Sequence, residues 1–299
     1  MEDSLRNAPA TPGPELAPTD AIETRMKIEL RDIGIPPRPA ILGQIEQEVA
    51  KDEPDFLRLA RLLSQDVGLA AGMIKVANSP FFSFGKKVPT VQEALLVLGI
   101  KLIVRTVAGL ALRQVFKHVP NMERFWDTSA QTAEVAGMLV RHLQPNCGMR
   151  PEDAHTFGLF RDCGISVLMI PFPEYRDALA RANEEAKQSF TAVEDGEIGI
   201  NHAAVGAELA EDWLLPSDIC QAIRHHHELA ALDGRLDITP RARTLIAIAQ
   251  LAEFLIQQKT ARAQTSEWTK LGTATLASLG LAEDDLPRLA EACSPAIGG

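Results

Sequence analysis

The spacing of apolar residues is the feature that most constrains the fold of this chain. The most apolar stretch is 91–112, and because Lys101 and Arg105 interrupt it, it predicts a buried helix rather than a membrane span. The sequence has no long run that alternates apolar and polar residues, few β-branched clusters and one tyrosine. Strand signals are therefore nearly absent, and the pattern predicts an all-α fold.

Local start and stop signals define the expected helices. Thr90 followed by Glu93 fits a capping box, and Asn78-Ser79-Pro80 fits the end of a helix. Helices are expected over 40–50, from 55 to the mid-60s, 68–77, 91–98, 100–116, 123–143, 152–161, 164–170, 174–188, 201–213, 217–230, 240–258, 265–279 and 283–292. The acidic run 194–197 is expected to be a solvated loop between two of them.

The expected helices fall into two lobes. Residues 1–24 hold four prolines among polar residues and predict a disordered tail. Residues 25–120 are expected to form an N-terminal helical lobe and residues 121–232 a second lobe. Residues 233–299 are expected to pack on the second lobe as a C-terminal helical segment. No receiver or output domain is recognisable in the sequence, which favours a stand-alone adaptor.

Composition excludes some classes of function. The net charge of −10 argues against a general nucleic-acid binder, which needs a basic surface. The first 24 residues contain no apolar core typical of a signal peptide, so we expect a cytoplasmic protein without membrane insertion. The four cysteines are widely spaced and form no CxxC pair, which favours reduced thiols over a disulfide or metal framework.

Two histidine-containing segments and one Arg-Asp pair suggest a modified metal site. An apolar helical run ends at Arg161-Asp162, where a His-Asp pair would offer two metal ligands. Guanidinium stays protonated and has no lone pair for a cation, so Arg161 cannot ligate a metal. His202 begins a predicted helix, and the run 225–227 consists of three histidines. Consecutive helical residues point about 100° apart, so we expect one of these three to face inward and two to be solvated.

The order and spacing of these motifs resemble the HDOD family, a branch of the HD superfamily related to HD-GYP phosphodiesterases. The resemblance covers about residues 33–230 and includes Val76–Phe82, Val88–Ala94 and Leu98-Gly99. It implies a two-lobed helical module, usually regulatory in bacterial signalling and usually without demonstrated catalysis. Positions that carry ligands in catalytic HD proteins fall at Thr128, Arg161, Asp162, His202, one residue of the triple (taken as His226) and Gln250.

The resemblance therefore implies a cleft with a degenerate ligand set. Thr128, Arg161 and Gln250 replace ligands, and repulsion from Arg161 is expected to exclude a metal. We expect no catalytic residue and no cofactor, and a non-catalytic regulatory module whose partners are other signalling proteins or a second copy of the chain. One alternative is a metal-dependent phosphohydrolase or cyclic-dinucleotide phosphodiesterase. Another is a sensor that binds a nucleotide second messenger on Arg161 without turnover.

Overall fold

The computed structural model describes residues 33–83, 87–143, 147–260 and 264–297. The chain divides before Ile35, and Ile35–Gly299 forms one compact unit. The predicted tail 1–24 and Phe84 lie outside the described residues. All described helices belong to the unit that begins at Ile35.

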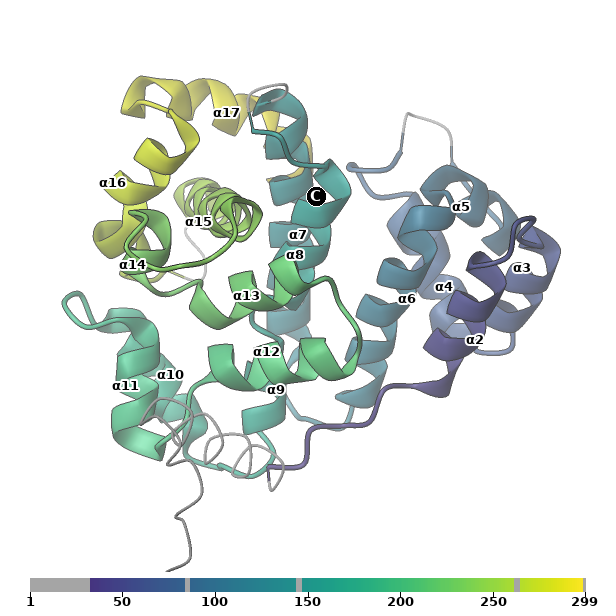
Figure 1. The fold of residues 1–299 in the computed structure, drawn as a ribbon, viewed down its shortest axis with the longest axis horizontal. Helices are drawn as coiled ribbons and strands as arrows, with labels where there is room; N and C mark the ends of the chain where they lie inside the picture. Colours follow the sequence, from purple (N-terminus) through teal and green to yellow (C-terminus); the bar gives the residue numbers. More distant parts are fainter. Residues whose placement is uncertain (1–32, 84–86, 144–146, 261–263, 298–299) are drawn as a thin grey trace, which may run out of the picture. The chain divides into compact units, whose positions relative to one another are not determined.

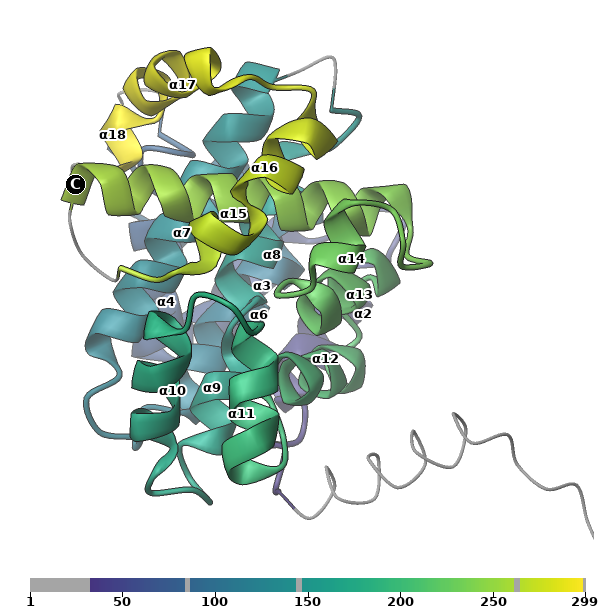
Figure 2. The same cartoon turned by 90° about the vertical axis from the view of Figure 1, so that its left-hand side faces the viewer.

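The described residues are helical and contain no strand, so the all-α prediction is confirmed (Figures 1 and 2). The first five helices are α2 (Ala40–Val49), α3 (Phe56–Ser64), α4 (Val67–Ala77), α5 (Val91–Leu98) and α6 (Ile100–Val115). The predicted cap at Thr90 is present: its side chain accepts a hydrogen bond from the Glu93 backbone N–H at 3.2 Å. These helices pack on one another around buried residues such as Ile45, Leu63 and Met73.

The remaining helices form a second group, on the left of Figure 1. They are α7 (Glu123–Leu143), α8 (Pro151–Phe160), α9 (Cys163–Leu168), α10 (Tyr175–Glu184), α11 (Phe190–Ile198), α12 (His202–Asp212), α13 (Ser217–His225), α14 (Leu229–Leu232), α15 (Pro240–Thr260), α16 (Glu267–Leu279), η1 (Glu283–Asp285), α17 (Leu286–Ala292) and α18 (Ser294–Ile297). The long α15 packs against α7, α8, α13 and α16. Among the described residues, no helix combines the length and apolarity that crossing a bilayer requires.

The structure differs from the sequence-based predictions in three helices and one loop. The helix expected over 174–188 ends at Glu184, and the one expected over 217–230 breaks after His225 and resumes at Leu229. The one expected over 283–292 begins as a 3-10 turn. The acidic run 194–197 belongs to helix α11, because Ser189 caps that helix by accepting from the Ala192 N–H at 3.2 Å.

The two groups of helices meet along α6 and α8. Gly109 on α6 permits this approach, since a Cβ there would lie 2.2 Å from Leu159 Cδ2. Phe81 is fully buried and stacks on the imidazole of His155 with ring centroids 5.1 Å apart. Phe81 and Phe82, the described aromatic residues of the loop after α4, therefore belong to the core.

Candidate metal centre

The Arg161-Asp162 pair lies at the junction of α8 and α9, where the chain turns toward α12. Gly164 makes this turn possible, because a Cβ there would lie 2.0 Å from the carbonyl oxygen of His202 and 2.7 Å from the backbone nitrogen of Gly206. Only hydrogen fits between the two backbones. The glycine therefore brings Asp162 next to the first turn of α12.

His202 is held at the start of α12 by polar contacts on both sides. Asn201 caps the helix by accepting from the Ala204 N–H at 2.9 Å. The fully buried His202 directs its Nδ1 at the two carboxylate oxygens of Glu194, at 2.9 and 2.8 Å. Glu194 is itself fully buried on α11 and accepts a hydrogen bond from the Tyr175 hydroxyl. Glu194, which the sequence predicts in a solvated loop, therefore orients the ring of His202.

Two histidines of the triple, rather than one, face the interior. Helix α13 ends at His225 and His226 is its C-cap, so His227 lies beyond the helical rotation on which the expectation of one inward histidine rested. His226 and His227 are 1% and 6% exposed, whereas His225 binds Glu228 at the surface. The Nδ1 atom of His226 donates to the Ile223 carbonyl at 2.7 Å, and Nδ1 of His227 contacts Glu267 at 2.5 Å.

His202, His226 and His227 therefore direct their Nε2 atoms toward one another. The Nε2 atom of His202 lies 3.3 Å from that of His226 and 3.2 Å from that of His227. The Oδ1 atom of Asp162 lies 3.3 Å from His226 Nε2 and 3.7 Å from His202 Nε2. One donor atom from each of the four residues lies within 4.8 Å of every other.

This donor set fits a first-row divalent metal. Metal–ligand bonds of about 2.0–2.1 Å in a tetrahedral site separate the ligand atoms by about 3.3 Å, which is close to the distances found here. Ligating histidines usually donate their other ring N–H to a carboxylate or a carbonyl, as each of the three does. Imidazole with one carboxylate is a ligand set that zinc accepts.

The Arg161 guanidinium occupies the other side of Asp162. Its Nε lies 3.0 Å from Asp162 Oδ2, and its Nη2 lies 3.0 Å from Glu253 Oε2 on α15. Arg161 is only 5% exposed. The Glu253 carboxylate contacts the same guanidinium, so Arg161 does not face the cluster as an unpaired cation. Arg161 therefore forms ion pairs with both Asp162 and Glu253.

The electrostatics of the cluster favour an ionised Asp162 and act in opposite directions on His202 and His227. Burial acts to raise the pKa of the Asp162 carboxyl, but Arg161 and the two nearest histidines hold it well below its usual range. Burial and the neighbouring histidines lower the pKa of His227. Burial opposes protonation of His202, yet Glu194 raises its pKa above the usual value. Burial also raises the pKa of Glu253, against the effect of Arg161.

Comparison with known proteins places this chain in a family. The profile of the HDOD domain matches residues 35–229. The chain belongs to the HDOD family. An uncharacterised Treponema pallidum protein is 24% identical over 196 residues, which are 65% of this chain and 38% of that relative.

Two solved structures share the HDOD fold. A proposed metal-dependent phosphohydrolase from Shewanella amazonensis superimposes with a TM-score of 0.64 at 16% identity and covers 93% of this chain and 98% of its own. A proposed signal transduction protein from Marinobacter aquaeolei gives a TM-score of 0.61 at 21% identity, over 94% of this chain and 65% of its own. At these identities the likeness establishes the fold.

The residues that converge in the structure differ from the set of cleft residues expected from the sequence. Asp162, His202 and His226 are brought together, with Arg161 beside them. Gln250 approaches only the backbone, since its Nε2 donates to the His226 carbonyl at 3.3 Å. Thr128 lines a separate pocket between α6, α7 and α8 and is not among the four ligating residues.

Sequence reasoning missed His227, Glu194, Glu253 and Glu267. Signals existed for two of them. Ser189 followed by apolar residues predicts a helix that carries Glu194. Glu253 follows Gln250 by three residues and therefore lies one turn along the same face of α15. No local pattern connects Glu267 with His227, because only the tertiary fold places α16 beside the turn after α13.

Proposed function

We propose that this HDOD protein is a non-catalytic signalling module whose cluster of Asp162, His202, His226 and His227 holds one divalent metal ion as a structural centre. The convergence of four protein donor atoms carries this proposal. A structural zinc site has four protein ligands, whereas a catalytic one keeps an open position for water. When bound, the metal would cross-link the α8–α9 junction, α12 and the turn after α13.

The chain's own residues support a rigid centre. Glu194, Glu267 and the Ile223 carbonyl fix the three imidazole rings through their Nδ1 atoms. Arg161 and Glu253 fill the space on the far side of Asp162 with a buried ion pair. This pair stands where the second ligand of an HD-type pair would lie, so it opposes the binding of a second metal ion. Signalling would then proceed through contacts with other proteins.

A metal-dependent phosphohydrolase or cyclic-dinucleotide phosphodiesterase is the second candidate. The same histidine-rich donor set favours it, and the Shewanella amazonensis protein carries such a name. It requires a coordination position left for water, whose pKa the metal lowers. The third hypothesis, a nucleotide bound on Arg161, loses support because Asp162 and Glu253 already engage that guanidinium.

Metal content and turnover together test the proposal. Untagged protein is analysed by mass spectrometry for bound metals and assayed with bis-p-nitrophenyl phosphate and cyclic di-GMP in added manganese. We expect about one zinc per chain and no turnover above the background. Metal far below one per chain would overturn the structural centre. Turnover that is lost in His226→Ala, with the fold retained, would establish the phosphodiesterase instead.

A further inference from the structure

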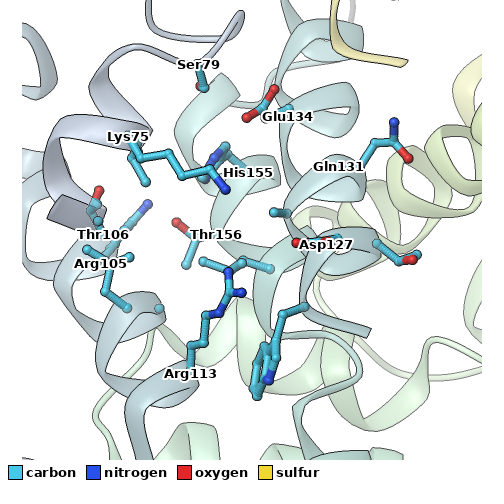
Figure 3. A pocket seen from close by; sticks show the side chains of 18 of the residues that line it. Lys75, Ser79, Arg105, Thr106, Arg113, Asp127, Gln131, Glu134, His155 and Thr156 are labelled. Atoms are coloured by element: carbon cyan, nitrogen blue, oxygen red, sulfur yellow. The ribbon is translucent and has the colours of Figure 1, made fainter. Parts of the chain in front are cut away.

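A large pocket of the described residues lies away from the metal centre, between α4, α6, α7 and α8 (Figure 3). Its volume is about 980 Å³, at the upper end of the range of about 300–1,000 Å³ typical of small-molecule sites. None of the four residues of the metal centre lines it. The pocket is therefore a second candidate site with its own chemistry.

The lining of this pocket is basic although the chain as a whole carries a net charge of −10. Its charged side chains are Lys75, Arg105, Arg113, Lys117 and Arg124 on the basic side and Asp127 and Glu134 on the acidic side. A local excess of positive charge in a concave site attracts and concentrates anions.

Most of this basic charge is available to a ligand. Arg105 pairs with Asp153, but the side chains of Lys75, Arg113 and Arg124 form no ion pair or hydrogen bond with the described part of the chain. Lys75 and Arg113 both extend toward the middle of the pocket in Figure 3, from α4 and α6. Burial raises the pKa of the Glu134 carboxyl, which weakens its competition with an anionic ligand for Lys75.

The rest of the lining suits the organic part of a ligand. Leu102, Leu110 and Leu159 supply apolar surface, and Trp126 adds an aromatic side chain. The hydroxyl of Thr156, near Lys75 and Arg113 in Figure 3, already donates to the Glu152 carbonyl at 2.8 Å, so its oxygen is left to accept. Apolar walls with a few polar groups of one charge are typical of sites for amphipathic small molecules.

The pocket is built by contacts that hold its two sides together. Leu159 fills the space beside Gly109, and the Arg105–Asp153 ion pair connects α6 with α8. Asp153 also accepts from Arg150 at 3.1 Å and from Arg241 at 2.6 Å, so it is anchored from α15 as well. A preformed pocket loses less conformational entropy when a ligand binds.

From these observations we infer that the pocket between α4, α6, α7 and α8 binds an organic phosphate of nucleotide size. Arg113 and Lys75 contact the phosphate oxygens, and the leucine-lined wall and Trp126 contact the organic part. Guanidinium matches phosphate geometry through paired N–H donors, and ammonium adds a point charge. This site is independent of the metal centre, so either proposal can fail alone.

Titration calorimetry tests the inference with four probes: pyrophosphate, GTP, cyclic di-GMP and citrate. We expect GTP or cyclic di-GMP to bind once per chain in the micromolar range and more tightly than pyrophosphate, which lacks an organic part. Arg113→Glu and Lys75→Glu should each weaken binding tenfold or more. Both side chains are exposed, so the variants should keep the fold and the metal content of the parent.

Matched controls make the same charge change elsewhere. Arg61→Glu on α3 and Lys187→Glu after α10 alter exposed residues outside the pocket, and both should bind as the parent does. Equal loss of affinity in all four variants would reduce the effect to net charge and overturn the site. Lack of binding of every probe at millimolar concentration would also overturn it, and citrate binding as tightly as the phosphates would exclude phosphate as the recognised group.

Discussion

The metal centre and the pocket between α4, α6, α7 and α8 place polar groups in opposite ways. In the metal centre, the three histidines and Asp162 are each fixed by a second partner, and only the shared donor atoms remain free. In the pocket, the side chains of Lys75 and Arg113 form no ion pair or hydrogen bond with the described residues. The closed cluster is suited to hold one ion permanently, and the open pocket is suited to bind and release a ligand.

The largest effect is expected where the backbones approach most closely at the metal centre. Gly164→Ala places a Cβ against the His202 carbonyl, and neither backbone can yield without separating α9 from α12. We expect the free energy of unfolding to fall by about 4 kcal/mol or more, measured by urea denaturation. Gly196→Ala is the control, because its Cβ meets nothing within 4 Å, and it should be neutral or slightly stabilising. Equal effects of the two changes would refute the close packing.

The next effect concerns the ion pair that closes the cluster. Arg161→Ala leaves Asp162 and Glu253 as buried carboxyls without their cation, so we expect a loss of about 3 kcal/mol in the free energy of unfolding. Arg224→Ala removes a more exposed pair with Glu208 and should cost less than about 1 kcal/mol. Unchanged stability of Arg161→Ala would show that the ion pair does not support the site.

Metal affinity should distinguish the inward His227 from the outward His225. His227→Ala should lower metal affinity at least a hundredfold, equivalent to about 2.7 kcal/mol, because three ligands remain of four. His225→Ala should keep the metal content of the parent, since that ring binds Glu228 at the surface. Competition with a chromogenic chelator measures both. A full metal load in His227→Ala would exclude this ring from the site.

The smallest effect on stability is expected from His155, which lines the pocket. Burial, with a contribution from Arg141, lowers the pKa of this histidine to about 4, against an ordinary value of about 6.5. The unfolded chain therefore binds more protons between these values. The free energy of unfolding is therefore unaffected by titration of His155 above pH 6.5. It falls by about 1–3 kcal/mol as the pH decreases from 6.5 toward 4, because the folded state resists protonation of this ring.

Replacement of His155 checks this assignment. His155→Phe should show a flatter dependence of unfolding free energy on pH between 6.5 and 4 than the parent. His118→Phe, at an exposed position, should keep the parent's slope. The same slope in all three proteins would mean that other groups cause the loss at low pH.

Local chemistry made much of the fold predictable. The capping pattern at Thr90 and the apolar run of α6 fix helices at or within one residue of the expected bounds. The metal centre was less predictable because its geometry depends on where helices end and meet. The break after His225 turns two neighbouring rings toward one point, and Glu253 reaches Arg161 only because α15 packs against α8. The break has no signal in the residues nearby, and the spacing of Gln250 and Glu253 indicates a shared face of α15 but not the helix that this face meets.

Helix α8 belongs to both regions of the molecule. Its middle carries His155 and Thr156 into the pocket, and its last turn leads directly to Arg161 and Asp162. Rigid secondary-structure elements can carry coupling between two sites, and α8 connects these two. Thermodynamic linkage then requires reciprocity: if an occupant of the pocket alters the affinity of the cluster for its ion, the ion alters the affinity of the pocket by the same factor.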